Sequence, residues 1–284
     1  MSAASGLVAL GEHLVVVADD DHALAVFPAH GDAPGRLVAV FDDPLPTDRA
    51  RRKARKADLE ILLHVPAPLA PPHGALLALG SGSTSRRDRG ACLPLDARGV
   101  LRGDVRPLDL APLYARLRTR LPALNLEGAA IVGDALVLLH RASGADRRNA
   151  CVRLPRSTLQ RGIDTGAFDA RDADIAITVV DLGELEGAPW GFTDAAALDD
   201  GRIVFSAAAE AADDAYADGP LRGAALGWLT PDGRLGAMHR LALPHKVEGI
   251  AVQRIADGVA LRMVTDADDP GVPALLLATV LPLP

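Results

Sequence analysis

One short phrase recurs five times along the chain, and it constrains the fold more than any other feature. Each copy is a polar residue, then usually a small residue, and then a run of apolar residues. Successive copies begin 55, 67, 66 and 55 residues apart, which is too long for a solenoid repeat but suits a four-stranded blade with its loops. The repeat therefore predicts an all-β, five-bladed β-propeller. The copies are Ser5–Val8, Glu60–Leu63, Glu127–Ala130, Thr193–Ala196 and Glu248–Ala251.

The residues after each copy predict antiparallel strands. A turn follows, and then a second apolar run that ends in polar residues, as in Leu14–Ala18 before Asp19 and in Arg202–Ser206 of the fourth unit. Helix is scarce, and the one good candidate is Leu110–Leu121, where Asp109 can cap the start. We therefore expect four-stranded blades with one short helix near residues 110–121.

Other architectures fit the spacing less well. A six-bladed ring is the main alternative, with a degenerate unit in the two longer spacings, but the helix candidate fills one of them and the polar loop Arg156–Asp174 fills the other. A βαβ fold needs amphipathic helices between its strands, and only one segment qualifies. We expect a single domain over residues 1–284, with Arg49–Lys56 as a basic patch on a surface connector. The last unit reaches only a third strand, Ala274–Val280, so the way the ring closes stays open.

Composition narrows the choice of partners. The chain carries 30 Lys and Arg against 37 Asp and Glu, a net charge of −7, so a broad surface for nucleic acid is not expected. A small molecule, phosphorylated or not, is the expected ligand, and the oligomeric state is not predicted. The two cysteines make no disulfide framework or zinc site, and no apolar stretch is long enough to span a membrane. Since the N-terminus also shows no signal pattern, we expect a cytoplasmic protein.

The polar residue of the phrase predicts a ring of ligands. In a propeller the innermost strand of each blade lines the central channel, so a residue repeated at its start reaches the axis once per blade. Here three carboxylates and two hydroxyls would meet, and their mutual repulsion calls for a cation. Because every donor is an oxygen atom, Ca²⁺ is the expected cofactor. The alternative is that each Glu-Gly only begins a strand and that the ring binds water. The expected metal ligands are Ser5, Glu60, Glu127, Thr193 and Glu248.

Three longer segments resemble the calcium-activated apyrases, a family of five-bladed nucleotidases. They are SGLVALGEHLVVVADDD, NLEGAAIVGDALVLLHRAS and HKVEGIAV, and they fall in the matching order. The resemblance implies a central calcium at the ring of five residues, with Asp19 and Arg141 in the pocket above it. Ile61 stands where that family has tryptophan, and Thr193 replaces a serine. We expect the chain to be closer to an uncharacterised bacterial propeller family than to the apyrases.

Independently of any family, the ends of the second strands place polar side chains at one rim of the channel. Arginine there can donate two hydrogen bonds to a phosphoryl group, and an aspartate can orient water. The alternative is that the aspartates only end strands and that the arginines are solvated. We expect catalytic roles for Asp19 and Arg141 and substrate binding by Asp20, Arg86, Arg87 and Asp266.

Two functions of different classes follow from this site. One is a calcium-dependent hydrolase that acts on a phosphate or ester substrate at the channel mouth. The other is a non-catalytic propeller that binds a small ligand or a protein and holds a structural cation. A cation open to solvent and ringed by acid and arginine favours the enzyme, whereas a plugged channel favours the scaffold.

Overall fold

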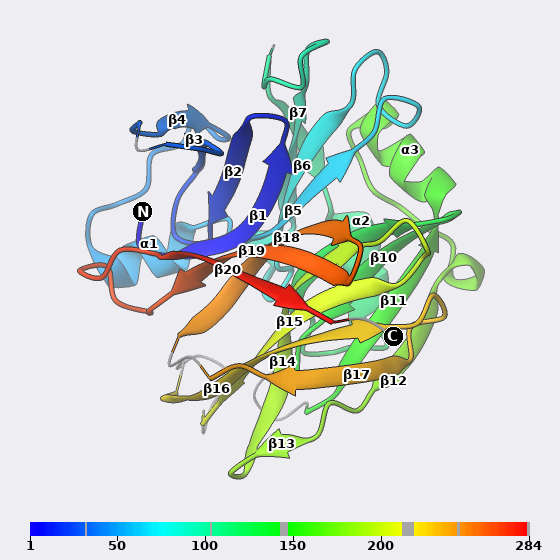
Figure 1. Cartoon of the computed structure of the whole chain (residues 1–284). Coiled ribbons are helices and arrows are strands. Elements are labelled where there is room, and N and C mark those ends of the chain that lie inside the picture. Colours follow the sequence, from blue (N-terminus) through cyan, green and yellow to red (C-terminus); the bar gives the residue numbers. More distant parts are fainter. Residues whose placement is uncertain (32, 103, 143–146, 212–218, 243–244, 283–284) are drawn as a thin grey trace.

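The computed structural model describes residues 1–31, 33–102, 104–142, 147–211, 219–242 and 245–282. Its strands form five antiparallel sheets that follow one another along the sequence (Figure 1). Blade one contains β1 (Ala4–Leu10), β2 (His13–Ala18), β3 (Ala23–Pro28) and β4 (Arg36–Ala39). Blade two contains β5 (Leu59–Val65), β6 (Ala75–Gly80), β7 (Arg89–Pro94) and β8 (Arg106–Asp109). Blade three contains β9 (Leu126–Val132), β10 (Ala135–His140), β11 (Asn149–Pro155) and β12 (Ala176–Val180).

The last two blades vary the pattern. Blade four contains β14 (Ala188–Ala197), β15 (Ile203–Glu210), β16 (Leu221–Leu229) and β17 (Leu235–Arg240), with the two-residue strand β13 (Glu184–Leu185) added beside β14. Blade five contains three described strands, β18 (Lys246–Ile255), β19 (Gly258–Asp266) and β20 (Leu276–Leu281). The expected third strand of the last unit is therefore the outer strand of its sheet.

The inner strands close a ring. Each of β1, β5, β9, β14 and β18 contacts the next, and β18 contacts β1. The five-bladed β-propeller expected from the repeat is confirmed. Residues at the N-terminus also join blade five, because Ala274 N donates to Met1 O at 3.0 Å and Ala3 pairs with Asp266.

Apolar packing between neighbouring blades holds the ring together. All residues of β6, β10 and β15 are buried, as expected for strands covered on both faces by adjacent sheets. The buried side chains form five clusters, one at each junction between blades. The cluster that joins blades five and one has the fewest buried members, Ala4, Leu7, Leu14, Val16 and Val264.

Three helices lie in the connections of the described residues. The expected helix forms as α2 (Ala111–Arg118), and Asp109 Oδ1 accepts a hydrogen bond from Ala111 N at its start. The connector read as a basic patch contains α1 (Arg49–Arg55), and the loop read as polar contains α3 (Arg156–Thr165), which ends at Gly166 with φ +79°. Neither helix has the long apolar stripe that marked α2. Within the described residues, no helix combines the length and apolar character needed to cross a membrane.

Candidate functional site

Every inner strand carries a β-bulge at the repeated polar residue. In each hairpin of the first two strands the register shifts by one residue, and the extra residue faces no partner. A bulge re-aims its side chain and is common near functional sites. The five bulged residues are the five expected ligands, Ser5, Glu60, Glu127, Thr193 and Glu248.

The glycine after three of these bulges is explained by the close approach of neighbouring inner strands. A Cβ atom on Gly249 would lie 2.8 Å from Leu7 N of blade one, and one on Gly128 would lie 2.7 Å from Ala195 N of blade four. Such distances leave no room for a side chain. The Ser-Gly and Glu-Gly pairs of the phrase therefore combine a bulged polar residue with a strand contact that requires glycine.

The two hydroxyl residues of the ring tie adjacent blades together. Ser5 Oγ donates to Leu59 O at 2.6 Å, and Thr193 Oγ1 donates to Val247 O at 2.7 Å. Each acceptor directly precedes the glutamate at the bulge of the next blade. Asp194 strengthens the second junction, because its Oδ2 accepts a hydrogen bond from Ile250 N at 2.7 Å. Both hydroxyl oxygens keep lone pairs for another ligand.

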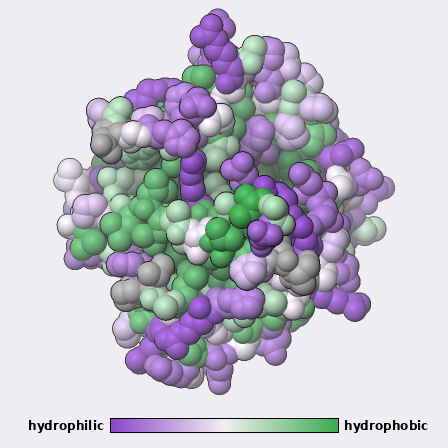
Figure 2. Space-filling view, in the orientation of Figure 1, coloured by the Kyte–Doolittle hydropathy of each residue, from purple (hydrophilic) through white to green (hydrophobic). Residues whose placement is uncertain are grey.

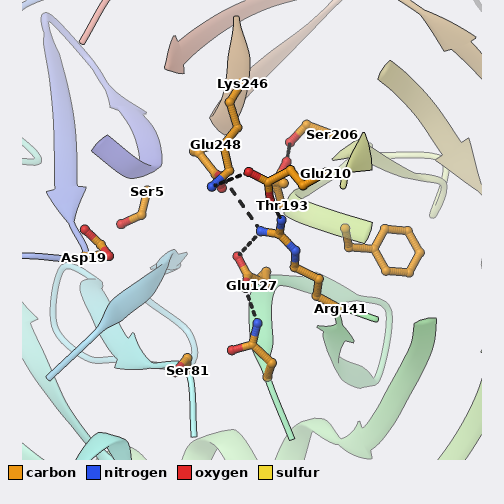
Figure 3. A network of polar contacts seen from close by, with 12 residues as sticks. Ser5, Asp19, Ser81, Glu127, Arg141, Thr193, Ser206, Glu210, Lys246 and Glu248 are labelled. Atoms are coloured by element: carbon orange, nitrogen blue, oxygen red, sulfur yellow. Dashed lines mark hydrogen bonds and ion pairs between the residues drawn. The ribbon is translucent and has the colours of Figure 1, made fainter. Parts of the chain in front are cut away.

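A buried ionic network occupies one side of the channel (Figure 3). Arg141 Nη1 lies 3.5 Å from Glu127 Oε2 and 3.8 Å from Glu248 Oε1, and its Nη2 contacts Glu210. Lys246 Nζ lies 2.9 Å from Glu248 Oε1 and 3.3 Å from Glu210 Oε1. Burial raises the pKa of Glu248 to about 8 despite these two cations. Its Oε2 atom is buried and accepts no hydrogen bond from the described residues.

A second acidic group lies at blades one and two. Oxygen atoms of Asp19, Asp58 and Glu60 all lie within 4.8 Å of one another. Lys56 Nζ contacts Asp19 and lies 2.8 Å from Asp58 Oδ1, while Arg87 Nη1 donates to Asp58 Oδ2 at 2.7 Å. Burial, together with the nearby carboxylates, raises the pKa of Glu60 well above its usual value. Glu60 makes no hydrogen bond or ion pair with any described residue.

The backbone at Asp58 is unusual for a residue with a side chain. Its φ is +56°, in the left-handed region, and its carboxylate is buried. Ser81 Oγ also donates to Asp58 Oδ2, at 2.5 Å. Such strain persists only where the surroundings fix the residue, and it concentrates at functional sites.

The expected rim residues divide into those at the channel and those outside it. Asp19, Arg87 and Arg141 join the two groups described above. Asp266, whose pKa burial raises to about 7, lies opposite Lys246 in the β18–β19 pairing. Asp20 instead turns to α1, where Arg52 Nη1 donates to its backbone oxygen at 2.9 Å. Arg86 is exposed and makes no ion pair with the described residues.

Four charged channel residues were missed from the sequence. They are Lys56, Asp58, Glu210 and Lys246. Asp58 and Lys246 stand two residues before Glu60 and Glu248, and Asn125 stands two before Glu127, where its Nδ2 donates to Glu127 Oε1. A repeat phrase extended by two residues would have included them. Glu210 was missed because β15 continues beyond Ser206, where the strand was expected to end.

Blade four leaves room for Arg141. The position two before its bulged residue is Gly191, which pairs with Ala208. A Cβ atom on Gly191 would lie 2.8 Å from Arg141 Cγ, so the arginine crosses this glycine to reach Glu210. A larger residue at Gly191 would displace the guanidinium from the three glutamates.

The carboxylates of the two groups outnumber their cationic side chains, and a hard cation needs such an excess of negative charge. Six carboxylates face four cationic side chains among these described residues, so at least two negative charges stay uncompensated when all are ionised. The ring offers oxygen donors alone, and Glu248 Oε2 is buried without a partner. These features fit calcium. The carboxylates are Asp19, Asp58, Glu60, Glu127, Glu210 and Glu248, and the cations are Lys56, Arg87, Arg141 and Lys246.

A family profile matches residues 1–281, and it is described as a family of unknown function, DUF6929. The chain belongs to this family. No curated protein matches the sequence. The expectation of an uncharacterised propeller family agrees with the DUF6929 match, whereas no comparison adds support for the apyrases.

Several solved structures resemble this member of DUF6929 at low identity. An α-L-arabinanase mutant of Cellvibrio cellulosa matches with a TM-score of 0.45 and 10% identity over 98% of this chain and 92% of the other. A protein from Lactobacillus plantarum gives 0.42 and 11%, over 96% and 69%. A mutant apocarotenoid oxygenase of Synechocystis gives 0.41 and 11%, and the DUF6929 chain, matched over 98%, spans 57% of its length. Since all three TM-scores lie below 0.5, none of them says what this chain binds or does.

Proposed function

We propose that the chain is a calcium-dependent hydrolase of small phosphorylated or ester substrates, with its site at the mouth of the channel. One observation carries the proposal. Five bulges at equivalent positions of the inner strands carry three glutamates and two hydroxyls, and the carboxylates described around them outnumber the cations. The repeat phrase in the sequence predicts the same five residues as ligands.

Glu60, Glu127 and Glu248, with the hydroxyl oxygens of Ser5 and Thr193, would hold the cation. When bound, calcium would supply positive charge that neutralises oxygens of the substrate. Glu60 is the most available ligand because no described residue pairs with it. Burial and the neighbouring carboxylates of Glu127, Asp58 and Asp19 raise its pKa, and Lys56 offsets only part of this effect.

Arg141 and Asp19 supply the other two roles. The guanidinium of Arg141 has five N–H donors, so it can keep its contact with Glu210 and still donate to a phosphoryl or carbonyl oxygen. Asp19 is held by Lys56, and burial raises its pKa, which brings a carboxylate closer to the range of a general base for water. Asp266, with a pKa of about 7, is a second group at this rim suited to proton transfer.

The resemblance to calcium-activated apyrases makes nucleoside di- and triphosphates the first substrates to test. Ile61 is a reason to test other substrates as well. Isoleucine has no aromatic ring on which a nucleotide base could stack, and Ile61 is fully buried in the core between blades two and three. We therefore include sugar phosphates and simple esters among the substrates.

The test is product release with calcium and with chelator, for the native chain and for Asp19→Asn and Arg141→Ala. Arg98→Ala is the matched control for Arg141→Ala, since Arg98 is an exposed arginine in the connection between β7 and β8. We expect calcium-dependent turnover that falls at least about tenfold in both site variants and stays unchanged in Arg98→Ala. No calcium-dependent release from any of these substrates would contradict the proposal.

A second function is favoured by a specific observation. Arg141 and Lys246 already lie among Glu127, Glu210 and Glu248, so the protein neutralises part of the ring by itself. A non-catalytic propeller that binds a small ligand or a protein would have the same network. Calcium binding without turnover on any substrate would select this function.

A further inference from the structure

Blade five ends in an open sheet edge. Its described strands are β18, β19 and β20, whereas the sheets of the other blades have four or five strands. β20 therefore presents a row of backbone N–H and C=O groups with no neighbouring strand among the described residues. Such an edge is a template for another extended chain.

Exposed apolar side chains are concentrated on blade five. Nine large hydrophobic residues are exposed among the described residues, and five of them belong to blade five. On β20 itself Leu276 is 56% exposed and Val280 is 53% exposed. Figure 2 shows hydrophobic surface at the centre of this view, where Figure 1 places β20. The five residues are Ile255, Val272, Leu275, Leu276 and Val280.

The outer strands of three other blades are protected by charge, whereas β12 of blade three is also uncharged and differs from β20 in that it completes a four-stranded sheet. β4 carries Arg36, β8 carries Arg106 and Asp109, and β17 carries Arg240. Charged residues at an edge oppose pairing with a second chain. β20 reads Leu-Leu-Ala-Thr-Val-Leu and has no charged residue, proline or glycine.

We propose that β20 pairs with β20 of a second copy of this chain across a two-fold axis. The edge calls for an extended strand, and a two-fold axis places an antiparallel strand against itself. A charge at the two-fold axis would meet its own copy, and a charge elsewhere on the strand would face an apolar residue of the other copy, so an uncharged strand suits pairing with itself. Each fifth blade then gains the fourth strand that the other blades possess.

The side-chain pattern suits this self-pairing. Leu276, Ala278 and Val280 alternate with more covered residues and share the exposed face of the strand. A pairing centred on Ala278 sets Leu276 of one copy opposite Val280 of the other. The small Ala278 side chains meet at the axis, and the larger apolar ones cover each other on both sides.

Light scattering on the purified full chain tests the proposal. We expect a mass twice the 29.5 kDa of one chain at micromolar concentration and above. Leu276→Lys combined with Val280→Lys should give the monomer, because four like charges then face one another. Val179→Lys is the matched control, since Val179 is 57% exposed on β12, the fourth strand of a complete blade, and it should leave the dimer intact.

Cross-linking gives a second readout that does not depend on loss of association. Ala278→Cys should form an intermolecular disulfide under mild oxidation, while the two native cysteines are buried and stay reduced. A wild-type chain that is monomeric throughout this range would overturn the proposal. So would a dimer that survives the double lysine variant, because its interface would then lie on another surface.

Discussion

The bulged residues of the inner strands fall into two groups that use one structural position differently. In blades one and four the residue is a hydroxyl, and it donates to the backbone of the next blade. In blades two, three and five it is a glutamate. Glu127 and Glu248 face cationic side chains, and Glu60 makes no hydrogen bond or ion pair with the described residues.

This difference separates what holds the ring together from what the ring can bind. A neutral hydroxyl bonded to a carbonyl is satisfied within the protein. A glutamate is not satisfied by backbone contacts here, and burial raises the pKa of both Glu60 and Glu248. We therefore assign blade-to-blade cohesion mainly to the hydroxyl positions and most of the affinity for a cation to the glutamate positions.

The largest expected effect is on the glutamate side. Lys246→Met removes the cation between Glu210 and Glu248 and leaves buried carboxylates with Arg141 alone. Loss of one partner from a buried ionic network costs about 3 kcal/mol or more. Urea denaturation without metal should show this loss. The exposed Arg51→Met is the control and should change stability by less than about 0.5 kcal/mol. Equal stability of the two variants would mean that the network carries no energetic weight.

A smaller effect is expected on the hydroxyl side. Thr193→Val keeps the shape but leaves Val247 O without its donor, which costs about 1–2 kcal/mol. Thr193→Ser restores the hydroxyl and should recover most of that loss. Because the residue acts through the backbone, its removal should weaken calcium binding much less than Glu60→Gln does. Equal loss of calcium affinity in both variants would erase the distinction between the two groups.

The smallest effect concerns the dependence of stability on pH. Asp266 has a pKa of about 7 in the folded protein, above its usual value of 3.8, so the native state keeps a proton that the unfolded chain loses. Stability should therefore fall as pH rises from about 4 to about 7. The full shift corresponds to roughly 4 kcal/mol, and solvent screening of this partly exposed carboxyl reduces it, so Asp266→Asn should flatten the fall by on the order of 1 kcal/mol. Melting temperatures measured across this pH range check the prediction. A steeper fall in the Asp266→Asn variant would contradict it.

The fold was predictable because the repeat consists of apolar runs whose spacing equals the length of a blade. The ring of five residues followed from the same phrase. The bulges did not, because nothing in Ser5-Gly6 or Glu127-Gly128 distinguishes a bulge from a regular strand start. The helix α3 was also missed, since Arg156–Thr165 buries only a few apolar side chains on a mostly polar sequence.

The charged partners of the ring were harder to find than the ring. Lys56 and Lys246 are two of only three lysines in the chain, and both are buried at the channel. The rarity of lysine beside 27 arginines is visible in the sequence, but it does not indicate where the lysines lie in the fold. Glu210 joins Arg141 across 69 residues, so only the folded ring brings the pair together.

Calcium titration of the metal-free protein, followed by calorimetry, tests the central claim most directly. We expect a single class of site, and we expect calcium to raise the melting temperature because it binds only the folded state. Glu60→Gln and Glu127→Gln should weaken binding at least about tenfold, while Thr193→Ser should leave it nearly unchanged. No heat of binding, together with identical melting in calcium and in chelator, would contradict a calcium site at the inner-strand bulges.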